Sequence, residues 1–221
     1  YYHQSPARFI ELAETNNLII PLAKFINEES MRIAKLLEPY NIEVSLNVSP
    51  VQILQAGFVN ELVELAKQYE VDPNNIAIEI TETFLMENFD AVNAKLKLLQ
   101  GYGFKIHLDD FCTGYSSMLY LKELPINSIK IDKEFTRFLN TDSYSRAIVN
   151  KLAALANSLE LEIIVEGVED EKQLAFLTKN GCNIIQGFLV SKAVPFNSLV
   201  ELIEGVNVTK KIEIITDKKK K

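Results

Sequence analysis

The alternation of short runs rich in Ile and Val with longer runs of helical periodicity restricts this chain to few folds. Runs with the composition of strands cover 42–49, 76–82, 104–110, 128–132, 162–168 and 183–188. Helical patterns cover 5–15, 21–38, 50–69, 87–100, 143–159, 170–180 and 196–204. Strands that alternate with helices are typical of parallel βαβ units, so the sequence predicts an α/β fold.

Parallel strands can form an open doubly wound sheet or a closed barrel. No Gly-rich phosphate loop follows an early strand, which disfavours a dinucleotide-binding open sheet. Strands between two helix layers should be apolar on both faces. Here Glu79 alternates with Ile78 and Ile80, and His107, which we interpret as a hydrogen-bonded interior histidine, alternates with Leu108. The pattern favours a barrel with a polar interior, a modified (β/α)8 TIM-type barrel.

The strands found are too few for an eight-stranded barrel, and the deficit lies before the helical run 5–15. We therefore expect the N-terminal strands to be missing or incomplete in this chain. The first residue is Tyr1 rather than Met, which also suggests a fragment of a longer product. We expect one domain over 1–206 and a Lys-rich tail over 207–221.

Charge and hydropathy exclude several classes of function. The 221 residues carry a net charge of −7; removing 208–221, with six lysines and two acids, leaves 17 bases against 28 acids, or −11. A domain this acidic lacks the positive electrostatic field that binds the phosphates of duplex nucleic acid. No apolar run approaches the roughly 18 residues of a membrane helix. We expect a cytoplasmic domain, whose parent protein could be anchored to a membrane upstream.

Polar residues gather toward the C-terminal ends of the predicted strands. They are Asn47, Glu79, Glu82, Asp109, Asp110, Lys130, Glu166 and Gln186. In a parallel barrel these ends open on one rim, so the side chains converge. Carboxylate and carboxamide oxygens suit Mg²⁺ or Mn²⁺, and so many carboxylates repel one another unless cations neutralise them. Two divalent cations about 4 Å apart would form a clamp for phosphodiester hydrolysis.

At these residues the chain resembles the EAL-domain family, the phosphodiesterases of the bacterial messenger cyclic di-GMP. Eight segments match in the family's order and cover nearly all of 5–205. They are Ser5–Glu14, Ser45–Ser49, Ile78–Thr83, Leu108–Phe111, Thr113–Ser117, Ile129–Asp132, Val165–Glu169 and Ile185–Phe188. The family fold is a modified (β/α)8 barrel, and the product of its reaction is linear pGpG.

The resemblance implies a role for each matching residue. The metal ligands for two Mg²⁺ or Mn²⁺ ions would be Asn47, Glu79, Asp109, Asp110 and Glu166. Lys130 would contact the attacking water or the phosphate, and Gln186 would orient water or phosphate oxygens. Glu82 would anchor the loop 111–117, which in the family couples metal binding to dimerisation. The resemblance also implies a homodimer and an upstream sensory or GGDEF-type domain.

The chain departs from the family pattern in two places. The Glu-Ala-Leu segment that names the family is absent, and its glutamate is a metal ligand, so we expect the chain as given to bind metal poorly and turn over slowly or not at all. Cys112 stands where the family loop usually has Gly. A side chain there is harmless at negative φ and costs about 1 kcal/mol or more at positive φ.

Two other functions compete with hydrolysis of cyclic di-GMP. The first is a degenerate EAL domain that acts as a non-hydrolytic cyclic di-GMP receptor or a protein-interaction module. The retained set of ligand-type residues favours the enzyme, because a receptor has little need for it. The second is an unrelated barrel enzyme for a phosphorylated metabolite, which would bind phosphate at backbone amides after the last strands. The run 187–191 offers little glycine for such a site.

Overall fold

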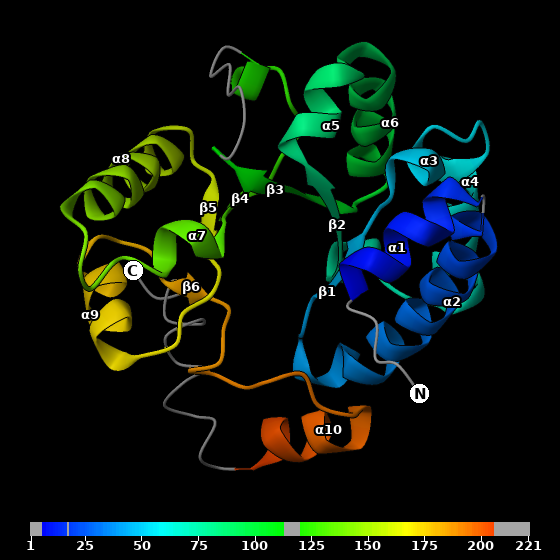
Figure 1. The fold of residues 1–221 in the computed structure, drawn as a ribbon. Helices are drawn as coiled ribbons and strands as arrows, with labels where there is room; N and C mark the ends of the chain where they lie inside the picture. Colours follow the sequence, from blue (N-terminus) through cyan, green and yellow to red (C-terminus); the bar gives the residue numbers. More distant parts are fainter. Residues whose placement is uncertain (1–5, 17, 113–119, 206–221) are drawn as a thin grey trace. The chain divides into compact units, whose positions relative to one another are not determined.

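A computed structural model describes residues 6–16, 18–112 and 120–205 (Figure 1). The chain divides into two compact units. Unit 1 comprises Tyr1–His107 and Ser117–Ile126, and unit 2 comprises Leu108–Ser116 and Asn127–Lys221, as far as they are described. The predicted tail 207–221 and most of the loop after Phe111 lie outside the described residues. No helix in the described ranges is long and apolar enough to span a bilayer.

The strands form one sheet in the order β1-β2-β3-β4-β5-β6, so each strand pairs with its neighbours in sequence. The strands are β1 Val44–Asn47, β2 Ile76–Thr81, β3 Lys105–Phe111, β4 Ser128–Ile131, β5 Glu162–Val165 and β6 Ile184–Ile185. The pairs β1–β2, β4–β5 and β5–β6 are parallel. All six predicted strands are confirmed; β3 is shifted by one residue toward the C-terminus, and each of the other five is shorter than predicted by one to four residues.

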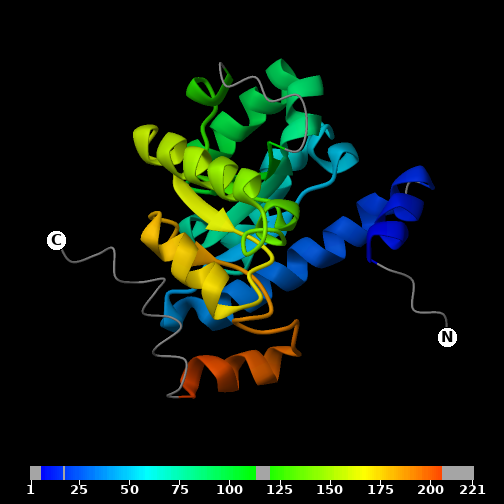
Figure 2. The same ribbon diagram turned by 60° about the vertical axis from the view of Figure 1, so that its left-hand side comes forward.

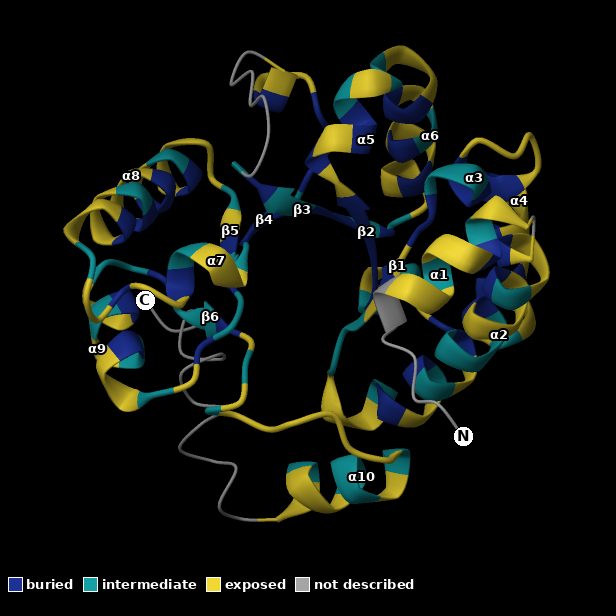
Figure 3. Ribbon diagram, in the orientation of Figure 1, coloured by how far each residue is buried: buried dark blue, intermediate teal, exposed yellow. Residues whose placement is uncertain are grey.

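The helices of unit 1 cover its strands. They are α1 Pro6–Thr15, α2 Ile19–Leu37, α3 Pro50–Ile53, α4 Phe58–Gln68, α5 Glu82–Glu87 and α6 Phe89–Gly101, with the 3₁₀ turns η1 Glu38–Tyr40, η2 Pro73–Asn75 and η3 Tyr120–Lys122. Helix α2 packs on β1 and on α4, and α5 packs on β2. Ile76, Ile78 and Ile80 of β2 are buried, so the apolar face of the strand belongs to the core. Figure 3 draws β2 largely in the colour of buried residues.

The predicted helix 50–69 is interrupted, and α5 was not predicted. Ser49 caps α3 by accepting a hydrogen bond from the Val51 amide. Helix α3 then ends at Ile53, and α4 begins only after Gly57. Lys95 Nζ donates to the carbonyl oxygens of Ile53 and Gln55, at 2.7 and 2.8 Å, so a side chain distant in sequence satisfies carbonyls that a continuous helix would have paired.

Unit 2 repeats the strand–helix pattern with helices α7 Lys133–Thr136, α8 Ser143–Ser158, α9 Glu171–Lys179 and α10 Phe196–Glu204. Helix α8 packs on β4 and β5, and it lies beside β5 in both ribbon views (Figure 1 and Figure 2). Asp132, Asp142 and Asp170 cap α7, α8 and α9, so a carboxylate stands at each positive helix start. Helix α7, a single turn, was not predicted.

Candidate active site

Lys130 lies at the centre of the charged cluster in unit 2. It is the third residue of β4, and its side chain is 4% exposed. Its Nζ lies 2.7 Å from Glu166 Oε1 and 3.2 Å from Asp109 Oδ1. These three predicted site residues come from β3, β4 and the end of β5, and the structure brings them together. An ammonium this well buried persists as a cation only beside such carboxylates.

Asp110 adds further negative charge to this cluster. Its pKa is raised, first because its carboxyl is partly buried and then because Asp109 and Asp132 repel a second negative charge; Lys130 and Lys133 oppose the shift. Asp110 also adopts the left-handed backbone conformation, with φ of 54°. Burial and the neighbouring carboxylates together therefore disfavour the charged form of Asp110.

Backbone hydrogen bonds place Gln186 beside Glu166. The Glu166 amide donates to the Ile131 carbonyl at 3.0 Å, and the Gln186 amide donates to the Val165 carbonyl at 2.8 Å. The Val168 amide in turn donates to the Gln186 carbonyl. A Cβ on Gly187 would stand 2.2 Å from the Val168 carbonyl oxygen, so only glycine permits this close approach. The Gln186 side chain is exposed.

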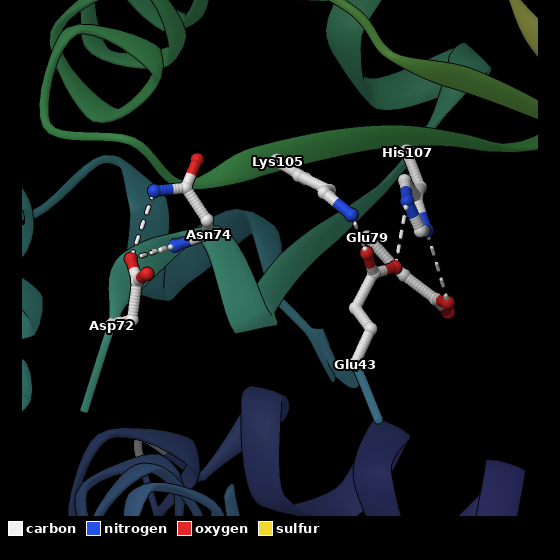
Figure 4. Close-up of polar contacts among 6 residues, drawn as sticks. All are labelled: Glu43, Asp72, Asn74, Glu79, Lys105 and His107. Carbon is white, nitrogen blue, oxygen red and sulfur yellow. Dashed lines mark hydrogen bonds and ion pairs between the residues drawn. The ribbon is translucent and has the colours of Figure 1, made fainter. Parts of the chain in front are cut away.

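A second charged cluster lies in unit 1 and centres on His107 (Figure 4). His107 is buried on β3, and its Nε2 lies 3.2 Å from Glu43 Oε1. Its Nδ1 lies 3.9 Å from Oε1 of Glu79, a buried residue of β2. Lys105 Nζ pairs with the other oxygen of Glu43. The predicted interior position of His107 is confirmed, and a carboxylate lies on each side of its ring.

The charged groups in this cluster shift one another's pKa values. Burial alone would lower the pKa of His107, but the contacts with Glu43 and Glu79 outweigh burial and raise that pKa. Burial alone would raise the pKa of Glu43, but His107 and Lys105 lower it. The imidazolium is thus favoured between the two carboxylates.

Asn47 and Glu79 are register partners at the ends of β1 and β2. Asn47 is exposed and lines a cavity of about 420 Å³, which is also lined by Glu14 of α1 and Asn27 of α2. Glu82, the first residue of α5, is 4% exposed. Its predicted partner is the loop 111–117, of which 113–117 lie outside the described residues, so the anchoring role stays a prediction.

The predicted metal ligands are divided between the units. Asn47 and Glu79 belong to unit 1, whereas Asp109, Asp110 and Glu166 belong to unit 2. Within the part of the chain that the structure describes, no group of three or more His, Cys, Asp or Glu side chains stands ready to hold a metal ion. A two-metal centre that uses all five ligands therefore stays a prediction.

Cys112, the departure from the family loop, has a φ of 67°. In this left-handed region a residue with a Cβ costs about 1–2 kcal/mol. Cys112 is therefore the strained case at positive φ and not the harmless case at negative φ. Sequence reasoning also missed Glu43. It lies within the predicted strand 42–49, on the same alternating face as Ser45 and Asn47, so the alternation could have placed it on the polar face but not beside His107.

Known proteins resemble this chain over most of its length. Residues 3–193 match the EAL domain. MucR of Pseudomonas aeruginosa, a bifunctional diguanylate cyclase/cyclic di-GMP phosphodiesterase, is 38% identical over 199 residues, which are 89% of this chain and 29% of MucR. The chain therefore spans less than a third of the length of that relative.

Solved structures give the same result. The PaMucR phosphodiesterase in complex with c-di-GMP matches with a TM-score of 0.85 and 36% identity, over 90% of this chain and 83% of that chain. A manganese/cyclic di-GMP complex of BlrP1 from Klebsiella pneumoniae matches with a TM-score of 0.72 and 26% identity, over 78% of this chain and 44% of that chain. These matches confirm the predicted TIM-barrel-type α/β fold.

Proposed function

Because the chain belongs to the EAL-domain family, we propose that it is a phosphodiesterase that hydrolyses cyclic di-GMP to linear pGpG and so ends a second-messenger signal. The observation that carries the proposal is the buried ammonium of Lys130 between Asp109 and Glu166, at the C-terminal ends of parallel strands. In barrels of this type the active site lies at those ends.

The donor types of the predicted ligands suit a divalent metal. The predicted ligands offer carboxylate and carboxamide oxygens, which Mg²⁺ and Mn²⁺ prefer. The pKa of Asp110 is raised first by burial and then by Asp109 and Asp132, and a bound cation would favour its charged form. When bound, two such ions would supply a nucleophile from water and stabilise charge on the phosphate. BlrP1, with manganese and cyclic di-GMP bound, supports this choice of metal.

We assign the steps of the reaction to residues of this chain as follows. The water oxygen bonds to phosphorus and gives up a proton while the P–O3′ bond breaks, and the released 3′ oxygen takes up a proton, so the proton count is unchanged overall. Lys130, held by Asp109 and Glu166, would direct its ammonium at the attacking water or at a phosphate oxygen. Gln186, fixed through its backbone next to Glu166, would orient water or a phosphate oxygen. Binding and charge placement, rather than a covalent intermediate, would carry the reaction.

The setting of the domain is part of the same proposal. We propose a cytoplasmic location, a homodimer coupled through the loop 111–117 and Glu82, and an upstream sensory or GGDEF-type domain. The length of MucR, of which this chain matches only 29%, is compatible with further domains. Cyclic di-GMP would be the ligand in either the hydrolytic or the receptor function.

The test is an assay of pGpG formation from cyclic di-GMP with Mg²⁺ or Mn²⁺, separated by chromatography. The 221-residue chain and the longest natural polypeptide that contains it are assayed side by side, with an Asp109→Ala variant of each as control. We expect metal-dependent pGpG from the longer polypeptide, little or none from the 221-residue chain, and none from either Asp109→Ala variant. Tight binding of cyclic di-GMP without turnover in the longer polypeptide would reject the enzyme in favour of the receptor.

A further inference from the structure

Glu43 and His107 have no role in the reaction described above, yet they lie beside one of its proposed metal ligands. Both oxygens of Glu43 are engaged, Oε1 at 3.2 Å from His107 Nε2 and Oε2 with Lys105 Nζ. The His107 side chain is only 4% exposed. A ring held at one nitrogen and closely surrounded has little freedom to rotate.

The other nitrogen of the ring is directed at Glu79 (Figure 4). His107 Nδ1 is 3.9 Å from Glu79 Oε1, which is too long for a hydrogen bond. This Nδ1 is buried, and it has no hydrogen-bond partner among the residues described. A buried donor without a partner is costly, and a movement of the Glu79 carboxylate by about 1 Å would satisfy it.

We propose that Glu43 and His107 form a positioning pair that orients the carboxylate of Glu79 through a hydrogen bond from His107 Nδ1. The metal-related part of this inference rests on the proposed function, in which Glu79 is a ligand. Glu79 would present one oxygen to the cation and accept the bond from Nδ1 with the other. Glu43 would fix the ring through Nε2, and Lys105 would fix Glu43.

General metal chemistry supports such a pair. Carboxylate ligands of protein-bound metals are themselves hydrogen-bonded, and loss of such an outer partner typically lowers metal affinity or activity by about 10–100-fold. The pair lies in unit 1 with Glu79, and neither Glu43 nor His107 is among the ligands that the resemblance implies. The two residues would thus set the orientation of a ligand without contacting substrate.

The test places His107→Leu, Glu43→Gln and His107→Gln in the longest natural polypeptide that contains this chain and compares them with that unchanged parent at one fixed pH. The matched control is Glu64→Gln, the same change in an exposed Glu64–Lys67 pair of unit 1. Without metal, the carboxyl ¹³C resonance of Glu79, identified by its loss in Glu79→Gln, reports the hydrogen bond. With Mn²⁺ but no substrate, free Mn²⁺ measured by electron paramagnetic resonance gives the affinity. Unfolding in EDTA checks that each variant folds.

We expect His107→Leu to move the Glu79 resonance and weaken Mn²⁺ binding about tenfold, the lower end of the range for outer partners. Glu43→Gln should do the same to a smaller degree, His107→Gln should recover part of the affinity, and Glu64→Gln should change neither. In turnover, excess Mn²⁺ should restore kcat in His107→Leu, with the KM for cyclic di-GMP unchanged.

Two results would overturn the positioning pair: a Glu79 resonance that is the same in His107→Leu as in the parent, or an Mn²⁺ affinity unaffected in folded His107→Leu. If His107→Leu does not fold, Glu43→Gln, which keeps the shape of the side chain, decides by the same two measurements. A parent chain that binds no Mn²⁺ while the Glu79 resonance still responds would reject the metal chemistry of the proposed function and support the hydrogen bond.

Discussion

Replacing Lys130 with Met should destabilise the chain strongly in the absence of metal. The change keeps the length of the side chain but removes an ammonium that is 4% exposed and lies 2.7 Å from Glu166 and 3.2 Å from Asp109. Removing one partner of a buried ion pair costs about 3–5 kcal/mol. The two carboxylates keep 17% and 20% exposure, so water can partly solvate them, and we expect about 3 kcal/mol, the lower end of that range.

The assay is thermal unfolding at pH 7 in EDTA. At about 2–4 °C per kcal/mol for a chain of this size, Lys130→Met should lower Tm by about 6–12 °C. Lys151→Met, the same change at an exposed lysine of α8, is the matched control and should leave Tm nearly unchanged. Adding Glu166→Gln to Lys130→Met should recover part of the loss, because one unpaired charge disappears.

Metal adds a second measurement to the same variant. Without the ammonium, Asp109 and Glu166 should attract a cation more strongly, so saturating Mn²⁺ should raise the Tm of Lys130→Met more than that of the parent. Hydrolysis should still be lost. The reasoning that these carboxylates depend on Lys130 would be refuted if the Tm of Lys130→Met in EDTA lay within about 2 °C of the parent's Tm. A difference that small corresponds to about 1 kcal/mol or less.

Three further predictions concern stability in EDTA. Gly187→Ala should cost about 3 kcal/mol, the upper end for overpacking, because its Cβ would meet Val168 backbone atoms at 2.2–2.4 Å. Cys112→Gly should stabilise the chain by about 1 kcal/mol, because it relieves a φ of 67°. Since the folded pKa of His107 is raised, its stabilising contribution is complete below about pH 6.5 and is lost as pH rises through the folded pKa, so the unfolding free energy should fall in that window.

Chemical denaturation measures the effects of Gly187→Ala and Cys112→Gly, and chemical denaturation as a function of pH measures the contribution of His107. Gly57→Ala is the control for the glycine variant, since nothing lies within 4 Å of its added Cβ, and it should be nearly neutral. A Cys112→Gly chain less stable than the parent would contradict the strain at that residue. Glu43 and Glu79 face the His107 ring, and Lys105 pairs with Glu43. In this pH window His107→Leu should flatten the decline in stability, and an identical slope would contradict its origin in His107.

The strands were predictable because their signal is local. Runs such as 76–82 combine β-branched residues with a two-residue alternation, and the structure buries Ile76, Ile78 and Ile80 accordingly. The alternation also placed Glu79 and His107 on one polar face, and both take part in the cluster found there.

The features that escaped prediction depend on distant residues or on backbone conformation. The end of the helix after Ile53 is stabilised by Lys95, more than forty residues away in sequence, so no local sequence pattern predicts it. The left-handed φ of Cys112 is a property of the folded backbone, and sequence reasoning could only name the two possibilities. The contact of Glu43 with His107 depends on which strands pair, so it became visible only with the fold.

The central claim is that carboxylates from separate strands bind a shared pair of cations beside the scissile phosphate. The most direct test is anomalous diffraction from crystals grown with Mn²⁺ and cyclic di-GMP. The account predicts two manganese peaks about 4 Å apart, coordinated by Asn47, Glu79, Asp109, Asp110 and Glu166. Two results would contradict the shared pair of cations. One is manganese bound away from these side chains, and the other is cyclic di-GMP bound at saturating Mn²⁺ with no manganese peak beside its phosphate.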